Sequence, residues 1–144
     1  RDGTKKMSKS DTSEFSRINL TDGADAIADK IKRAKTDPDL LPDSVKGLEG
    51  RAEAENLLGI YAALTDMSLE QAVAKFAGAQ FSAFKAAPAE AAVSVMGPIG
   101  AEMKRLMADP GYVDSILRRG AERANALAAP NLRAAQELMG LLRP

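Results

Sequence analysis

The chain has 144 residues, which is enough for one domain with a hydrophobic core, and its 20 basic and 20 acidic side chains give a formal net charge of zero. This balance argues against a protein held on nucleic acid by bulk positive charge, so an RNA contact would have to use a local basic patch. The sequence has no cysteine for disulfides or thiolate metal sites, no apolar run of membrane-spanning length and no apolar signal segment at its start, so we expect a cytoplasmic protein.

Lysines and serines alternate around one methionine near the beginning of the sequence, in the stretch Lys6-Met7-Ser8-Lys9-Ser10. Ammonium groups and hydroxyls on a loop can follow the oxygens of a polyphosphate as their charge changes. Charge runs are also common on surfaces that bind nothing, so a solvated basic loop is the alternative interpretation.

Residues 1–22 are expected to be loop, because serine and threonine are frequent there. Residues 17–20 alternate polar and apolar side chains and predict a short strand. The rest of the chain offers no partner strand. We therefore expect residues 1–22 to lack a partner within this chain and to be mobile.

Residues 23–144 predict an all-α fold of amphipathic helices. Asp22 is a suitable N-cap for a helix from about Gly23 to Lys35, which would bury Ile27 and Ile31. The basic residues of its last turn complement the helix dipole, and we prefer a solvated cationic end to an RNA contact. After this helix, Pro38, Pro42, Gly47 and Gly50 predict a loop that continues to residue 50.

The clearest helical pattern spans residues 51–65, with Arg51 near its exposed start. Its apolar side chains recur at i, i+3, i+4 and i+7, and these are Leu57, Ile60, Tyr61 and Leu64. Ser68 and Gln71 have the spacing of a capping box and open a short helix through about residue 77.

From residue 80 to residue 108 an apolar stripe continues, and its members are Phe81, Phe84, Ala91, Val95, Ile99, Met103 and Leu106. Pro88 fits a first helical turn and Pro98 should bend the helix. Asp109 and Pro110 predict a new helix as N-cap and N1 residues. Its predicted stripe consists of Tyr112, Ile116, Ala124 and Leu127. Pro130 predicts a break that lets the last segment, residues 132–142, move independently.

Several stretches together resemble the C-terminal part of bacterial tryptophanyl-tRNA synthetases, which belong to class I of the aminoacyl-tRNA synthetases. The basic stretch matches the second signature motif of that class, and the ordered set is specific for this family. The supporting stretches are residues 2–5, 16–22, 56–65, 108–112 and 120–124. The other class signature is built on histidines, and the sequence has none. We therefore expect the C-terminal portion of a longer enzyme, inactive by itself.

The resemblance implies that residues 1–22 are the end of a nucleotide-binding catalytic domain, most of which lies outside this chain. It also implies an ATP-binding loop made of Lys6, Met7, Ser8, Lys9 and Ser10. Lys9 is then the catalytic residue that stabilises the leaving pyrophosphate, and Lys6 supports it. Magnesium would accompany ATP, because no Asp, Glu or His cluster in the sequence has metal-ligand spacing. The helices from residue 23 to residue 144 would bind the anticodon region of tRNA(Trp), although no residue can be assigned to that contact.

The family further implies ATP, tryptophan and tRNA(Trp) as substrates, a homodimer, and a last helix that packs on the catalytic domain. Two alternatives remain. A tyrosyl-tRNA synthetase fragment would share the class motif, although that family usually adds a further RNA-binding domain. A non-catalytic helical interaction module would carry the basic loop by chance.

Overall fold

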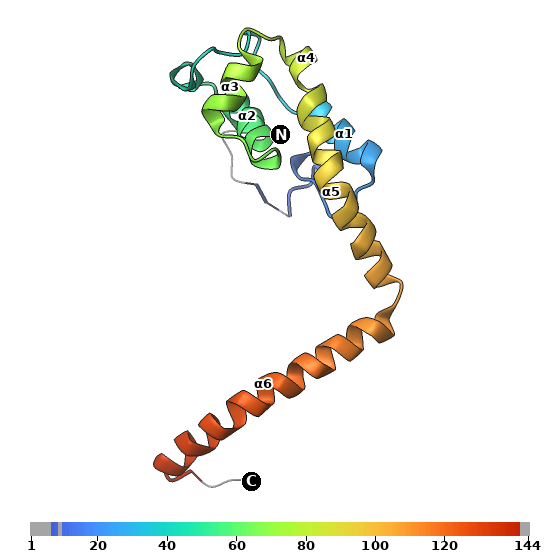
Figure 1. Ribbon diagram of the computed structural model, residues 1–144, viewed down its shortest axis with the longest axis vertical. Coiled ribbons are helices and arrows are strands. Elements are labelled where there is room, and N and C mark those ends of the chain that lie inside the picture. The colour runs from blue at the N-terminus through green and yellow to red at the C-terminus, as the bar shows by residue number, and fades with distance from the viewer. Residues whose placement is uncertain (1–6, 9, 142–144) are drawn as a thin grey trace. The chain divides into compact units, whose positions relative to one another are not determined.

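The computed structural model describes residues 7–8 and 10–141, and it consists of two compact units, residues 1–103 and residues 104–144 (Figure 1). The described part is α-helical, which confirms the predicted fold class. The helices are α1 (Ala24–Lys32), α2 (Ala52–Leu64), α3 (Leu69–Phe76), α4 (Phe81–Phe84), α5 (Ala86–Met107) and α6 (Pro110–Leu138), with the short 3-10 helices η1 (Glu14–Ser16) and η2 (Val45–Leu48). α5 runs from the first unit into the second.

The predicted strand at residues 17–20 is wrong, since these residues form no strand in the structure. A strand is stabilised by ladder hydrogen bonds to a partner, and this segment satisfies its backbone locally instead. The Asp22 N–H donates to the Asn19 carbonyl at 3.0 Å, and the Asn19 N–H donates to the Asp22 carboxylate at 2.8 Å. The two residues therefore close a turn that leads directly into α1.

The boundaries of α1 differ from the prediction at both ends. Gly23 is the N-cap, and α1 ends at Lys32 rather than at about Lys35. Asp22 is not a cap because its carboxylate is engaged by Asn19. At the C-terminal end, the Lys85 ammonium donates to the carbonyls of Lys32 at 2.9 Å and Ala34 at 2.6 Å. A lysine distant in sequence thus satisfies carbonyls that a helix end leaves without partners.

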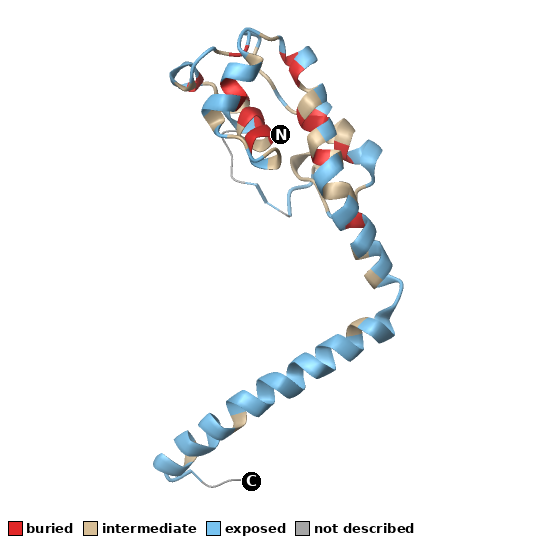
Figure 2. Cartoon of the chain, in the orientation of Figure 1, coloured by how far each residue is buried: buried red, intermediate tan, exposed pale blue. Residues whose placement is uncertain are grey.

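The larger core joins α2, α3 and α4 through an aromatic cluster. The ring of Phe76 meets those of Tyr61 and Phe84 edge to face, with centroids 5.0 and 4.8 Å apart. Leu57 and Tyr61 are buried as predicted, whereas Ile60 and Leu64 are only partly buried. Figure 2 shows that the buried residues are concentrated in the helices and loops of this unit.

Two sets of side-chain hydrogen bonds stabilise the N-terminal ends of α2 and α3. The predicted capping box is confirmed, since the Gln71 N–H donates to the Ser68 hydroxyl and the Ser68 N–H to the Gln71 side chain. Arg51, predicted at an exposed helix start, is instead largely covered. Its guanidinium forms two hydrogen bonds with the Asp37 carboxylate and donates to the Leu40 carbonyl at 2.7 Å. Arg51 therefore links the loop that precedes α2 to the N-terminal end of this helix.

A smaller core forms where α1 lies against α5. Its buried members are Ile27, Ile31, Ala89 and Ala92, and Ile18 from the N-terminal segment packs against them. The alanines of α5 let α1 approach closely. Because Ile18 joins this cluster, the part of the N-terminal segment next to α1 packs on the first unit.

The predicted stripe of α5 is wrong in part, because Val95 and Ile99 are 40% and 47% exposed. α5 buries the neighbouring face instead, with Pro88, Ala92 and Gly100. Pro88 stands in the first turn, where its missing N–H has no intrahelical partner to lose. Small residues determine which face is buried because they admit the backbone of the N-terminal segment.

In the second unit, α6 begins as predicted, with Pro110 at its start and the Asp109 carboxylate accepting from the Tyr112 N–H at 3.0 Å. The predicted break at Pro130 is wrong, since α6 continues through that residue to Leu138. No residue of α6 is buried, and Figure 2 shows the helix in the exposed colour. Its predicted stripe is accordingly exposed, with Leu127 at 76%.

We expect Gly100→Ala to loosen the N-terminal segment, because a Cβ at this position would stand 2.7 Å from the Leu20 carbonyl oxygen. The backbone has to shift, at a cost of about 1–3 kcal/mol in the free energy of unfolding. Urea unfolding measures the cost, and faster exchange of the Asp22 amide locates it. Gly59→Ala in α2 is the control, since its Cβ meets nothing within 4 Å and should stabilise the helix. Equal effects of the two substitutions would contradict the assigned contact.

Candidate functional site

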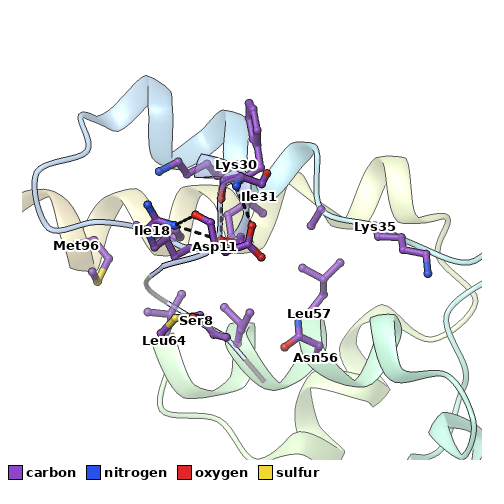
Figure 3. Close-up of a pocket in the computed structure, with 18 residues that line it drawn as sticks. Ser8, Asp11, Ile18, Lys30, Ile31, Lys35, Asn56, Leu57, Leu64 and Met96 are labelled. Atoms are coloured by element: carbon purple, nitrogen blue, oxygen red, sulfur yellow. Dashed lines mark hydrogen bonds between the residues drawn. The ribbon is translucent and has the colours of Figure 1, made fainter. Parts of the chain in front are cut away.

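A pocket of about 710 Å³ lies within the first unit, between residues 7–18 and the helices α1, α2 and α5 (Figure 3). Serine, aspartate and arginine side chains line it from the N-terminal segment. Aliphatic side chains line it from the helices, and they are Ile31, Leu57, Ile60, Leu64, Ala92 and Met96. Ile60 and Leu64 are only partly buried because they face this pocket. Met7 and Ser8 of the signature stretch thus lie at the edge of an amphipathic cavity.

Ser8 and Ser10 lie in a tight turn that is held by local hydrogen bonds. Their hydroxyl oxygens are 2.9 Å apart, and the Asp11 N–H donates to the Ser8 carbonyl at 3.2 Å. The Asp11 carboxylate accepts from the Ser13 N–H at 2.8 Å, which is an Asx turn. Both serine hydroxyls are exposed, so they are available to an incoming anion.

The five predicted loop residues are described only in part. Met7 and Ser8 line the pocket and Ser10 lies on the turn beside it. Met7 is 62% exposed, so it covers the pocket only partially. Lys6 and Lys9, the two residues predicted to be catalytic, lie outside the described residues.

Arg17 contacts both the turn that contains Ser8, Ser10 and Asp11 and the 3-10 helix η1, which follows this turn. Its guanidinium donates to the Asp11 carbonyl and to the Glu14 carboxylate, each at 3.0 Å. Its side chain is 17% exposed. In the sequence Arg17 belongs to a predicted strand and to a stretch that resembles the family, and no periodic signal marks it as a contact to the loop.

The residues on both sides of Arg17 are attached to the region of α1. Arg33, the residue that follows α1, stacks over the ring of Phe15 at 5.0 Å, and the Lys30 ammonium forms an ion pair with the Asp22 carboxylate. Burial alone would raise the pKa of Asp22, but the hydrogen bonds from Lys30 and from the Asn19 N–H lower it below its ordinary value. The carboxylate therefore remains charged in its partly covered position.

Basic side chains in the last turns of α1 and just after it are engaged in ion pairs. Besides the pair made by Lys30, Arg33 meets Asp29 at 3.0 Å and Lys35 meets Glu53 at 2.9 Å. These cations are therefore paired, whereas the sequence predicted a merely solvated cationic end.

Within residues 7–8 and 10–141, no group of three or more His, Cys, Asp or Glu side chains could hold a metal ion. The same residues contain no helix that is long and apolar enough to cross a membrane.

We expect the first unit to lose stability in acid partly through Asp22. The pKa of this carboxyl in the folded chain lies below its ordinary value of 3.8, so its contribution is present above that value and is lost as the pH falls through the lowered pKa. Asp22→Asn should therefore give a shallower decline of the unfolding free energy below pH 4, measured by urea titration at several pH values. An unchanged decline, or the same flattening in the control Asp43→Asn at an exposed loop position, would contradict this assignment.

Three comparisons place this chain among known proteins. The sequence profile of the family "tRNA synthetases class I (W and Y)" matches residues 1–96. Tryptophan–tRNA ligase of Rhizobium meliloti is 58% identical over 99% of this chain and 40% of its own length, and the same enzyme of Gloeobacter violaceus is 42% identical over 99% and 42%.

Among solved structures, the crystal structure of tryptophanyl-tRNA synthetase from Mycoplasma pneumoniae matches with a TM-score of 0.73 and 26% identity. The match covers 99% of this chain and 44% of that one. The chain thus spans about two fifths of the length of the curated relatives it matches. The resemblance drawn from the signature stretch is confirmed, and the chain belongs to the family of class I tRNA synthetases for tryptophan and tyrosine.

Proposed function

We propose that this chain is part of a tryptophan–tRNA ligase, which activates tryptophan with ATP and transfers it to tRNA(Trp). The observation that supports this most strongly is the continuous similarity to tryptophan–tRNA ligases along 99% of the chain, since a five-residue motif alone could occur by chance. The family profile includes tyrosine enzymes, but the curated relatives named above are tryptophan enzymes. Tryptophan is therefore the preferred substrate, and a non-catalytic helical module is not favoured.

In the proposed reaction the tryptophan carboxylate attacks the α-phosphorus of ATP, the bond between the α- and β-phosphates breaks, and pyrophosphate leaves. Negative charge grows on the leaving group in the transition state. An ammonium group held there stabilises the transition state more than the bound substrate, and so accelerates the step. We assign this role to Lys9, with Lys6 in support.

The described part of the loop fits a phosphate ligand. The hydroxyls of Ser8 and Ser10 lie 2.9 Å apart on an exposed turn, where both can donate to phosphate oxygens. Met7 would contact the nucleotide from the edge of the pocket. Magnesium would arrive with ATP, whose phosphates supply its oxygen ligands.

We propose that residues 1–22 complete a catalytic domain and that residues 23–144 form the anticodon-binding domain. α6 exposes a row of apolar side chains, including Ile116, Leu117 and Leu127. A row of this kind requires a partner surface, and the catalytic domain of the intact enzyme is the one we propose. The intact enzyme would be a cytoplasmic homodimer that binds tRNA(Trp). This chain without the rest of the active site would be inactive.

We expect Lys9→Ala in the intact enzyme to slow adenylate formation by roughly a hundredfold or more, because it removes a charge that acts on the leaving group. Tryptophan affinity should change little. Rapid-quench measurement of adenylate formation, with tryptophan binding measured separately, tests both statements. Lys46→Ala, an exposed lysine of η2, is the control. A normal activation rate in Lys9→Ala would remove the catalytic role from this lysine.

A further inference from the structure

The turn that carries the two signature serines is held by short-range contacts. Its hydrogen bonds join residues two or three positions apart, between Ser8 and Ser10, Asp11 and Ser8, and Ser13 and Asp11. Such bonds shape a turn but do not fix its place on the protein. The position of the signature hydroxyls therefore depends on what connects the turn to the folded unit.

The base on which the turn can be fixed is residues 18–22, and Phe15 on the other side of Arg17 is also contacted, by Arg33. Ile18 packs into the cluster between α1 and α5, and the Leu20 carbonyl lies so close to Gly100 that a Cβ there would stand 2.7 Å from it. Asp22 is paired with Lys30. Residues 18–22 are thus attached to both helices by packing and by charge.

Arg17 bridges the turn and this base. Its backbone adjoins Ile18, while its guanidinium reaches back six residues to the Asp11 carbonyl at 3.0 Å. The Glu14 carboxylate holds the second terminal nitrogen at 3.0 Å, which orients the planar group toward that carbonyl. A charged donor to a carbonyl oxygen makes a stronger hydrogen bond than a neutral one.

We infer that Arg17 is a positioning residue for the signature loop. It holds the Asp11 carbonyl, and through it the Ser8–Asp11 turn, at a fixed place beside the pocket. Its effect on the reaction rests on the function proposed above, because the loop has to meet ATP phosphates for its position to matter. Small displacements of groups that contact a transition state reduce rates strongly.

The first test uses the 144-residue chain and requires no enzymatic activity. In Arg17→Ala, amide exchange at Asp11 and Ser13, followed by NMR, should accelerate severalfold, while exchange in α2 stays unchanged. Arg17→Lys should be intermediate, since an ammonium can reach one acceptor but cannot bridge two in the same plane. Glu14→Gln should have a smaller effect, because the contact to the Asp11 carbonyl remains. Unchanged exchange at Asp11 and Ser13 in Arg17→Ala would overturn the inference.

The second test uses the intact enzyme. Arg17→Ala should slow ATP-dependent adenylate formation by roughly ten- to a hundredfold, with tryptophan affinity unchanged, and Arg17→Lys should recover part of the rate. A purely structural role would instead lower the melting temperature and tryptophan affinity together, and that outcome would overturn the inference. If the unaltered enzyme forms no tryptophanyl adenylate, the proposed function fails, while the exchange result on the chain still decides whether Arg17 holds the turn.

Discussion

The packing of α1 against α5 determines where the segment that carries Ser8 and Ser10 is attached to the first unit. Ile27 and Ile31 insert against Ala89 and Ala92, and the small alanine side chains leave room for Ile18 to join from outside. This packing gives the N-terminal segment a site on the first unit. Without it, the turn with Ser8 and Ser10 would be attached to the helices only by the chain itself, and the pocket beside it would lose one wall.

Ion pairs add to this packing by attaching segments of irregular structure to the helices and turns. Lys30 with Asp22, Arg17 with Glu14 and Arg51 with Asp37 each join a helix or turn to a segment that has no regular structure. Hydrogen bonds from Arg51 lower the pKa of Asp37 against the opposing effect of burial, and the backbone N–H of Asp39 adds to this. These charged side chains thus act locally, to hold loops.

α6 differs from the helices of the first unit, because none of its residues is buried and its helical form does not depend on packing. Its cap at Asp109, its alanine content and its length stabilise it locally, and Pro130 does not interrupt it. A helix of this kind carries its apolar row into solvent unless another surface covers it. Residues 104–144 therefore explain why this helix forms. They do not determine which surface covers its apolar row.

The sequence by itself determined the helical class, the capping box at Ser68, the N-cap at Asp109 and the buried positions of Leu57 and Tyr61 in α2, because each of these depends on residues within one or two helical turns. It also identified the family, since the order of short motifs is a property of the sequence. Tertiary structure decided the rest. Val95 and Ile99 have the spacing of a buried stripe, yet the neighbouring small residues are buried because they admit the backbone at Leu20. The partners of Asp22, Arg17 and Lys85 could not be predicted, because they lie across a turn or on another helix, and a polar side chain carries no periodic signal for a partner distant in sequence.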